Sequence, residues 1–515
     1  MKKILAWTGG ILALGIGAFL LFAPTIKGPA LWHVIGFGPD AISNETLTGK
    51  LKAPKGLTVR IFADNLPYAR VIRVTKTGDM IVSSTREGTL TLLYRDTDHD
   101  GVSDGRSTLL SGLDNPHGFV LKDGWLYVSE VTQIRRFPFD AISRQITGDP
   151  QMILTGLPAG GNHRTRTLDF GPDGRLYVSI GSSCNVCEEE NPFRATIISM
   201  NALGKDVKIF ATGLRNSVGF DWKKSGFGIG SLFATENSRD LLGDDTPHDE
   251  LNIVREGLDY GWPYAYDNGV PDPDGGMDYK QKAADSIHPY HGFGAHRAPL
   301  GIRFLSDTQA PVGYHGAALV ALHGSWNRST LAGYKVVSLH FDDQGNISEK
   351  DFLTGFITDG DTVIGRPVDV VQDARGIIYI SDDFAGKIYS VTWGDLIPEK
   401  QATEKAPKKA QDKTDASGQK MIRKHPLAGI PAKEVARAQQ AGMLTFIANG
   451  CAQCHVKAAA PASSYKPLRA LKNKYTVDRL AAFLKSPPSP MPPPDTDDAG
   501  RRDLAIYLLS IQEEK

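Results

Sequence analysis

The sequence predicts an all-β six-bladed propeller, preceded by a hydrophobic N-terminal helix and followed by a small all-α domain. One strand pattern recurs between residues 56 and 393, the composition changes after residue 393, and an apolar run stands near the N-terminus. A chain of 515 residues is also too long for one ordinary hydrophobic core. We therefore expect an N-terminal helix at 1–26, a propeller at 50–395, a linker at 396–425 and a helical domain at 426–515.

The N-terminal segment begins with Lys2 and Lys3 and continues with 19 uncharged, mainly apolar residues at 4–22. This run is longer than the hydrophobic core of a typical signal sequence and close to the roughly 20 residues that span a bilayer. No clear small-x-small cleavage site follows, which favours an uncleaved transmembrane anchor; a cleaved signal is the alternative. With the lysines on the short inner side, we expect the rest of the chain on the periplasmic side of a bacterial inner membrane.

Six short β-rich runs predict the propeller, and each follows glycine or other turn residues. Four of them share the pattern Gly-x-hydrophobic-Tyr/Ile-Val/Ile-Ser, and such repetition is typical of a blade-by-blade architecture. A pair of β-sandwiches is the alternative, but it does not explain why one pattern recurs. The wide gap between the fourth and fifth runs predicts a large insertion at 244–297. The runs are 79–83, 125–129, 175–179, 231–235, 318–322 and 377–381.

After Trp393 the chain becomes rich in Lys, Gln, Ala, Asp and Glu with no apolar periodicity, which indicates a solvated linker. Helical patterns follow at 432–449, 477–484 and 501–511.

The segment Cys451-Ala-Gln-Cys-His455 is the attachment signature of a c-type haem. The thiols of Cys451 and Cys454 would bond the haem, and His455 would be an axial ligand of its iron. A disulfide or half of a zinc site is the alternative, but the region offers no second ligand pair. Met491 is the only methionine after this motif and is our candidate for the other axial ligand. The C-terminal part is therefore predicted to be a small cytochrome c domain.

The charge balance and the other two cysteines limit the possible partners and the cellular compartment of the protein. Lysine and arginine number 58, as do aspartate and glutamate, so the net charge indicates no nucleic-acid partner. Cys184 and Cys187 form a second short-spaced pair, but Glu188 stands where a haem motif would have histidine. A local disulfide in an oxidising compartment is the expected role, and a working redox pair is the alternative.

Several ordered motifs between residues 56 and 393 resemble the family of soluble aldose/glucose dehydrogenases and sorbosone dehydrogenases, which use pyrroloquinoline quinone (PQQ). In combination and in this order they are specific. They are Asn162-His-Arg-Thr-Arg-Thr-Leu168 with Gly171-Pro-Asp-Gly-Arg-Leu-Tyr-Val-Ser179, Gly213-Leu-Arg-Asn-Ser-Val-Gly219, Asp249-Glu-Leu-Asn252 with Tyr260-Gly-Trp-Pro263, His323-Gly-Ser-Trp-Asn-Arg328, and Gly365-Arg-Pro-Val-Asp-Val370.

The resemblance implies roles for particular residues. His163 would take the substrate proton, since a neutral imidazole suits that task near pH 7. Arg215 would stabilise the negative charge that develops on the quinone as it accepts a hydride. The remaining residues of the predicted PQQ pocket are two arginines that would bind its carboxylates, an asparagine that would hydrogen-bond it and two further histidines: Arg328, Arg366, Asn216, His117 and His296.

Two calcium sites are predicted. The resemblance implies one beside the quinone, formed by Glu250, Tyr260 and Asp249, partly through backbone oxygens. The other comes from the sequence Asp96-Thr-Asp-His-Asp-Gly-Val-Ser-Asp104, in which Asp96, Asp98, Asp100 and Asp104 stand at alternating positions of an EF-hand-like loop. Position twelve is Ser107 instead of glutamate, so a complete EF-hand is excluded, and a polar hairpin turn is the alternative.

Together these features predict an anchored or exported quinohaemoprotein dehydrogenase. A sugar or aldehyde would be oxidised at PQQ, and electrons would pass through the haem to a respiratory acceptor, either a quinone or another cytochrome. Two segments depart from the glucose dehydrogenases: Ser325-Trp-Asn-Arg328 is closer to the sorbosone-type branch, and Gly181-Ser-Ser-Cys-Asn-Val-Cys187 replaces the loop after the catalytic histidine. The alternative function is a non-enzymatic propeller that binds a glycan or protein and is fused to an electron-transfer cytochrome.

Overall fold

The computed structural model describes residues 43–393, except 224–229, 276–278, 307–309, 311, 343 and 360. It also describes residues 426–427, 430–449, 451, 468, 471, 474–487 and 491–510 of the C-terminal part. The chain divides into two units, Met1–Ala402 and Thr403–Lys515. The predicted N-terminal helix and the whole of the predicted linker lie outside the described residues. Within the described ranges no helix combines the length and the apolarity needed to cross a membrane.

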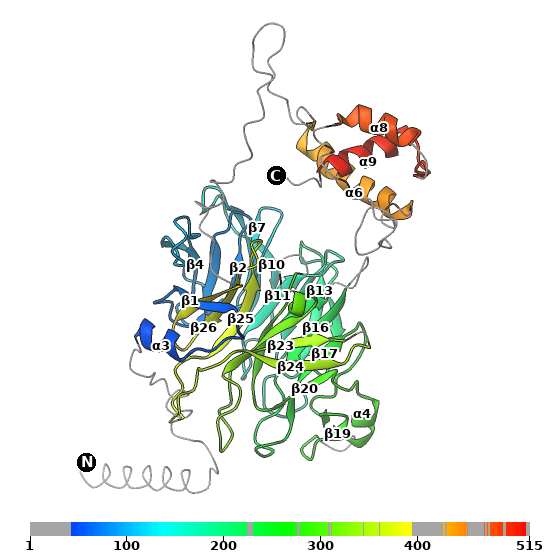
Figure 1. Ribbon diagram of the computed structural model, residues 1–515. Coiled ribbons are helices and arrows are strands. Elements are labelled where there is room, and N and C mark those ends of the chain that lie inside the picture. The colour runs from blue at the N-terminus through cyan, green and yellow to red at the C-terminus, as the bar shows by residue number, and fades with distance from the viewer. Residues whose placement is uncertain are drawn as a thin grey trace, which may run out of the picture. The chain divides into compact units, whose positions relative to one another are not determined.

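Six antiparallel sheets, one for each blade, confirm the predicted propeller (Figure 1). In the first blade the strands are β2 (Ala69–Val74), β3 (Met80–Ser84), β4 (Thr89–Leu93) and β5 (Arg106–Leu110). In the second they are β6 (Phe119–Lys122), β7 (Trp125–Ser129), β8 (Gln133–Asp140) and β10 (Gln151–Thr155), and β9 (Gln145–Ile146) also pairs with β8. In the third they are β11 (Arg166–Phe170), β12 (Leu176–Ile180), β13 (Thr196–Met200) and β14 (Lys208–Ala211).

In the fourth blade the strands are β15 (Phe220–Lys223), β16 (Ser231–Glu236), β17 (His248–Val254) and β20 (His291–Ala295). In the fifth they are β21 (Pro299–Phe304), β22 (Ala318–Leu322), β23 (Lys335–Phe341) and β24 (Ile347–Leu353). In the sixth they are β25 (Pro367–Gln372), β26 (Ile378–Asp382), β27 (Lys387–Trp393) and β1 (Leu57–Ala63).

The six recurring runs of the sequence are the second strands of the six blades. All five residues are buried in four of these strands, β3, β12, β22 and β26. A second strand is flanked by strands on both edges and by neighbouring blades on both faces, so it carries a continuous apolar run instead of an alternating one. This is why the pattern stands out in the sequence.

The ring closes where the first strand of the chain joins the last blade. Strand β1 pairs antiparallel with β27, with Leu57 opposite Trp393 and Val59 opposite Val391. Phe62 of β1 packs edge-to-face on Tyr379 of β26 at 4.9 Å, in a core that also contains residues of the first blade. The closure is therefore held by hydrogen bonds and apolar packing.

The insertion in the fourth blade is shorter than the sequence predicts. Strands β17 and β20 belong to the blade itself, so only the segment between them is inserted. It contains β18 (Ala265–Tyr266), β19 (Val270–Pro271) and α4 (Tyr279–Asp285), and Figure 1 shows α4 and β19 projecting beside β20. This unit also contains the helix α3 (Asn44–Lys50) and the 3₁₀ turn η1 (Val312–Tyr314).

Charged side chains cross the centre of the ring. Arg73 on β2 lies 2.8 Å from Asp369 on β25 and 3.8 Å from Asp169 on β11. Arg303 on β21 lies 3.3 Å from Asp221 on β15 and 4.0 Å from Asp169. These ion pairs tie together the innermost strands of five blades.

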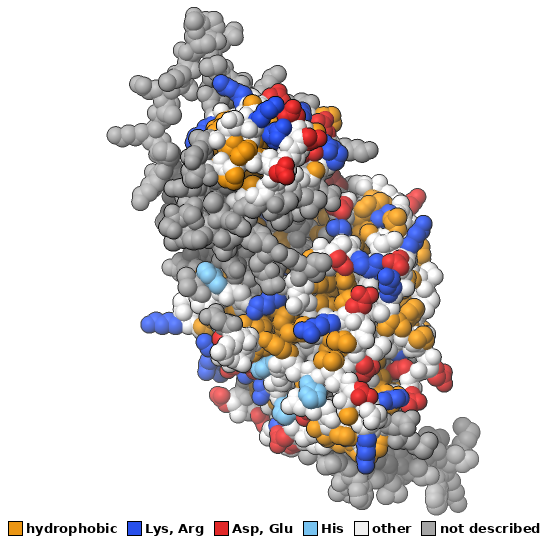
Figure 2. Space-filling model, turned by 90° about the vertical axis from the view of Figure 1, so that its right-hand side faces the viewer, with side chains coloured by type: hydrophobic (Ala, Val, Ile, Leu, Met, Phe, Trp, Pro, Cys, Tyr) orange, Lys and Arg blue, Asp and Glu red, His pale blue; other side chains and the backbone are white. Residues whose placement is uncertain are grey.

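The C-terminal unit contains the three predicted helices, α6 (Ala432–Ala448), α8 (Val477–Lys485) and α9 (Asp498–Ser510). They share one apolar core, and Arg437 of α6 binds both carboxylate oxygens of Asp503 at 2.8 and 2.9 Å. Gly442 allows α6 to approach α9, since a Cβ there would lie 2.3 Å from the Asp503 carbonyl oxygen. On the face drawn in Figure 2, positive and negative side chains are interspersed over the described surface.

Candidate active site

A cavity of about 240 Å³ lies at one end of the central channel. Its walls come from the N-terminal ends of the innermost strands and from the loops that follow the second strands, because both meet at the same face of the ring. Of the residues predicted from the sequence, six line it: His163, Arg215, Asn216, Asp249, His296 and Arg366. The lining also includes residues that the sequence did not single out: Arg70, Thr165, Asn237, Ser238, Asp240, His323, Trp326 and Asn327.

His163 stands in the loop before β11 and has a defined tautomer. Its Nδ1 lies 2.9 Å from Ser182 Oγ and 3.1 Å from the Ser182 carbonyl oxygen. Because Ser182 Oγ donates to the Cys184 carbonyl, the serine oxygens are left to accept, and Nδ1 carries the ring proton. Nε2 is then the basic nitrogen. Burial and the neighbouring Arg215 charge lower the pKa of His163 to about 3, so the ring is neutral at physiological pH.

Gly181 makes room for this arrangement. A Cβ at this position would lie 2.5 Å from His163 Cβ and 2.8 Å from Asn216 Oδ1. The glycine therefore lets the histidine and the asparagine pack over the same stretch of backbone.

Arg215 is buried, and protein acceptors occupy its guanidinium. Nε donates to the Asn185 carbonyl at 3.0 Å, Nη1 to the carbonyls of Asn237 and Ser238, and Nη2 to Asn185 Oδ1 and Asp240 Oδ2. All five N–H groups thus have partners. Arg215 contributes a fixed positive charge to the cavity wall, but not the free donor that the sequence analysis expected.

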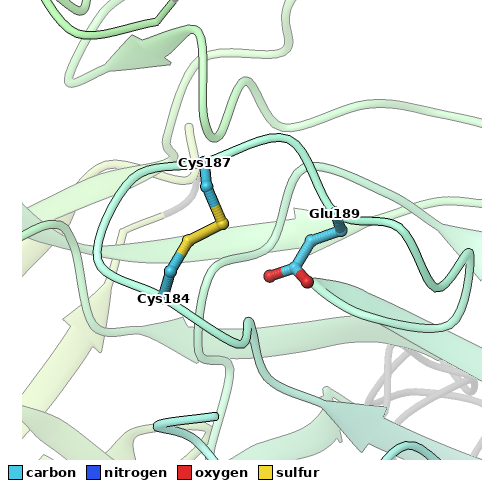
Figure 3. Close-up of side chains that lie close together, drawn as sticks. All are labelled: Cys184, Cys187 and Glu189. Atoms are coloured by element: carbon cyan, nitrogen blue, oxygen red, sulfur yellow. A yellow bond between two sulfur atoms is a disulfide. The ribbon is translucent and has the colours of Figure 1, made fainter.

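The loop that holds Arg215 is closed by a disulfide. Cys184 and Cys187 are bonded, with their Cα atoms 6.2 Å apart (Figure 3), which confirms the expected local disulfide. Asn185 inside this loop accepts from Arg215, and its carbonyl also accepts from Trp262 Nε1 at 3.0 Å. Glu189 on the same loop accepts from the Ser183 N–H at 2.5 Å. The disulfide therefore closes the segment that positions both Arg215 and, through Ser182, His163.

A second group of charged residues lies across the cavity from segments far apart in the chain. His323 Nε2 lies 2.9 Å from Asp383 Oδ1, and its Nδ1 lies 2.8 Å from Arg366 Nη2. Arg70 Nη1 donates to Asp383 Oδ2 at 2.8 Å. Burial and the Arg366 charge lower the pKa of His323 to about 3. His323 lies in a segment that the sequence analysis quoted, whereas Arg70 and Asp383 carried no sequence signal.

The two weaker histidine candidates occupy different places. His296 lines the cavity, where its Nε2 donates to the Gly243 carbonyl at 2.7 Å and its Nδ1 lies 3.4 Å from Asn327 Nδ2. His117 lies in a smaller neighbouring cavity, 3.5 Å from Arg70 Nη2. Burial, followed by the Arg70 charge, lowers the pKa of His117 well below its usual value. Both rings are therefore held by protein contacts.

The structure does not place Arg328 on the cavity. Its guanidinium donates to the carbonyls of Asp244 and Thr330 and lies 3.2 Å from Asp245 Oδ1. It therefore ties two loops together, and the prediction that it binds the cofactor is corrected. Trp326 and Asn327, which precede it, line the cavity instead.

The predicted calcium ligands Asp249, Glu250 and Tyr260 all have hydrogen-bond partners within the protein. Asp249 accepts from the N–H groups of Ser238 and Ala298, and Tyr260 donates its hydroxyl to the Ile253 carbonyl at 2.6 Å. Glu250 lies opposite another carboxylate across the β16–β17 pair, and burial raises its pKa well above the usual value. The side-chain oxygens of Asp249 and Tyr260 have partners within the protein, and the calcium site beside the quinone stays a prediction.

The helical unit holds two of the four predicted haem ligands within the described residues. Cys451 and Met491 are both partly buried and pack against the core formed by α6, α8 and α9. Cys454 and His455 lie outside the described residues. The haem site therefore stays a prediction.

A family model described as TrAA12-like matches residues 51–259 and 270–394. The chain belongs to the TrAA12-like family. The match covers all six blades and confirms, for the propeller, the resemblance that the motifs indicated. An uncharacterized protein of Borreliella burgdorferi is 32% identical over 364 residues, which cover 68% of this chain and 93% of that protein.

Solved structures share the fold of this TrAA12-like propeller. The calcium structure of a Trichoderma reesei enzyme of carbohydrate-active family AA12 is 22% identical, with a TM-score of 0.59, over 67% of this chain and 97% of the other. The holo PQQ domain of a pyranose dehydrogenase from Coprinopsis cinerea is 21% identical, with a TM-score of 0.56, over 66% and 97%.

Proposed function

We propose that this chain is a PQQ-dependent sugar dehydrogenase that passes electrons from the propeller to a haem c on the same chain. The cavity carries the proposal, because it combines a neutral histidine of defined tautomer with three arginines at one end of the channel. Membership of the TrAA12-like family, and a fold shared with the PQQ domain of a pyranose dehydrogenase, support it.

The donors of the cavity fit an anionic, planar cofactor such as PQQ, which has three carboxylates. Among the described residues, Arg366 Nη1 and the side-chain NH₂ group of Asn216 have no hydrogen-bond partner, although both residues line the cavity. Guanidinium and amide N–H groups are suited to carboxylates and carbonyl oxygens. Arg366, Arg70 and Asn216 would hold the cofactor, and Arg215 would add its fixed charge. When bound, PQQ supplies a quinone that accepts a hydride from the substrate.

His163 would take the proton of the substrate hydroxyl at Nε2. Its Nδ1–H is fixed on Ser182, so the ring cannot present its protonated nitrogen to the substrate without losing that hydrogen bond. Burial is the main reason why the pKa is lowered to about 3, and the positive charges of Arg215, Arg194 and Arg166 add to the shift. A bound anionic cofactor would offset those charges and raise the pKa of His163 toward the range of a general base.

The electron route and the location of the protein complete the proposal. Haem c would be bonded by Cys451 and Cys454, with His455 and Met491 on its iron, and would pass electrons to a respiratory quinone or another cytochrome. Joining both units in one chain raises their effective concentration for this transfer. The protein would lie in the periplasm with an N-terminal anchor, and the disulfide between Cys184 and Cys187 supports the oxidising compartment.

The proposal is tested on the purified full-length protein with PQQ and calcium. Aldoses and simple aldehydes are added, and both a soluble dye acceptor and the absorption band of reduced haem are followed. The dye reports oxidation in the propeller, and the haem band reports the internal transfer. A sugar that binds without reducing either acceptor would indicate the binding-module alternative.

His163→Gln is the matched variant. We expect it to lower turnover with the dye by at least about 100-fold, as loss of a general base does, while PQQ binding and the oxidised haem spectrum stay unchanged. His288→Gln, in the inserted segment of the fourth blade and exposed, is the control and should keep wild-type turnover. Equal turnover in both variants would remove His163 from the mechanism.

A further inference from the structure

We propose that the loop between β4 and β5 binds a calcium ion that stabilises the closure of the propeller ring. One carboxylate oxygen each from Asp96, Asp98 and Asp104 lies within 4.8 Å of the others. Such acidic clusters are common on protein surfaces without an ion, so proximity is only the first step. This site is separate from the candidate active-site cavity, and none of the residues that line that cavity belongs to it.

The buried member of the cluster supplies the second observation. Asp96 is 8% exposed, and its Oδ2 accepts from the Gly101 N–H at 2.9 Å. Its Oδ1 is fully buried and has no hydrogen-bond partner in the described part of the chain. A buried carboxylate oxygen without a hydrogen-bond partner lowers the stability of the fold. The loop adds two further carboxylates beside Asp96, which repel it unless a cation lies among them. A cation among the three would satisfy this oxygen.

The donor set suits calcium. Oxygen ligands at alternating positions of a tight loop are typical of this ion, which accepts six to eight of them at irregular angles. Asp100 and the carbonyl of Val102 stand at two further ligand positions of an EF-hand-like loop, and Gly101 has the φ of +89° that its sharp turn requires. The bidentate glutamate is missing, so we expect a dissociation constant on the order of 10⁻⁴ M, as in extracellular calcium modules.

The position of the loop indicates what the ion would do. Ser103 donates its N–H to the Phe62 carbonyl at 2.8 Å, and Arg106 Nη1 donates to the Asp64 carbonyl at 2.7 Å. Phe62 belongs to β1, the outer strand of the sixth blade, whereas the loop belongs to the first blade. An ion that orders the loop would therefore strengthen the contact between the first and last blades. Binding to the folded state alone raises stability with ligand concentration.

The test uses the full-length protein, treated with a chelator and without PQQ, so that it does not depend on the proposed enzymatic function. CaCl₂ is titrated from the micromolar to the millimolar range, and the unfolding midpoint of the propeller is followed. Tb³⁺ luminescence, excited through tyrosine, measures metal binding directly, because Tyr94 precedes the loop. We expect a saturable rise in the midpoint and a saturable Tb³⁺ signal that Ca²⁺ displaces.

Asp98→Asn is the main variant, since Asp98 is exposed and asparagine keeps an Oδ1 that can accept from the Asp100 N–H. This variant should need about ten times more calcium to reach half of the maximal rise in the unfolding midpoint, equivalent to about 1.4 kcal/mol of binding free energy. It should also give a weaker Tb³⁺ signal at a fixed Tb³⁺ concentration. Asp149→Asn removes the same charge at an exposed site outside the loop and should behave as wild type. Identical calcium responses in wild type and Asp98→Asn would overturn the proposal, as would the absence of any response in the wild type.

Discussion

His323 shows how its surroundings set the charge of a buried histidine. Arg366 and Asp383 hold its two ring nitrogens, and burial together with the Arg366 charge lowers the pKa to about 3. In the unfolded chain the pKa returns to about 6.5. Between pH 6.5 and 3 the unfolded state therefore binds a proton that the folded state does not, so this group destabilises the fold as the pH falls through that window.

We expect the free energy of unfolding of His323→Gln to fall less steeply with acid than that of the wild type. Between pH 6.5 and 3 the two slopes should differ by up to about 1.4 kcal/mol per pH unit. Urea unfolding at pH 7, 6, 5 and 4 without added cofactor measures this slope. Burial raises the pKa of Glu236 and Asp249 to about 7, which acts in the opposite direction, so the comparison must be between variants. His288→Gln should keep the wild-type slope, and an equal slope in both variants would contradict the assignment.

The loop at 182–187 fixes both side chains that we propose for catalysis, His163 and Arg215. Ser182 holds His163 and Asn185 holds Arg215, and the disulfide joins Cys184 and Cys187 on either side of Asn185. A displacement of about 1 Å at such a site can cost a factor of 100 in rate.

Replacing both cysteines of this loop with serine should therefore lower the dye-coupled turnover by about tenfold or more. Amide hydrogen exchange in residues 182–187 should become faster, while exchange in the strands of the third blade stays slow. Asn185→Ala, which keeps the disulfide but removes the Oδ1 contact to Arg215, serves as the comparison. If the serine variant kept wild-type turnover despite faster exchange, the disulfide would have no positioning role.

The crossing of α6 and α9 depends on one glycine. A Cβ on residue 442 would meet the Asp503 carbonyl oxygen at 2.3 Å and Tyr507 Cβ at 2.7 Å. We expect Gly442→Ala to destabilise the helical unit by about 1–3 kcal/mol through overpacking, measured by its loss of helical circular dichroism on heating. Gly49→Ala in α3 is the control, since nothing lies within 4 Å of the added Cβ, and it should be neutral or slightly stabilising.

At the scale of the whole molecule, the propeller is a closed ring in which non-covalent contacts hold the first and last blades together. Phe62 is 3% exposed and packs on Tyr379, so Phe62→Ala should destabilise the propeller by about 3–5 kcal/mol. Because the helical unit has a core of its own, its unfolding should not shift. Calorimetry or blade-specific hydrogen exchange would detect this. Leu203→Ala, at an exposed position, should shift neither transition; a shift of both by Phe62→Ala would contradict independent cores.

The sequence by itself determined the number of blades, the Cys184–Cys187 disulfide and the three C-terminal helices. These features are local: a buried second strand carries its apolar run within five residues, and a helix carries its periodicity within a few turns. The motifs also located His163, Asn216 and Arg366, because each stands beside turn residues or strand ends that open onto one face of the ring.

Only the tertiary structure decided which side chains meet in the cavity. Arg70 and Asp383 are 313 residues apart, yet they form one ion pair because ring closure brings the first and last blades together. Arg328 stands next to the lining residues in sequence but turns toward a neighbouring loop, and Arg215 has no free donor. Local patterns cannot specify such contacts, since they depend on how six blades pack around a common axis.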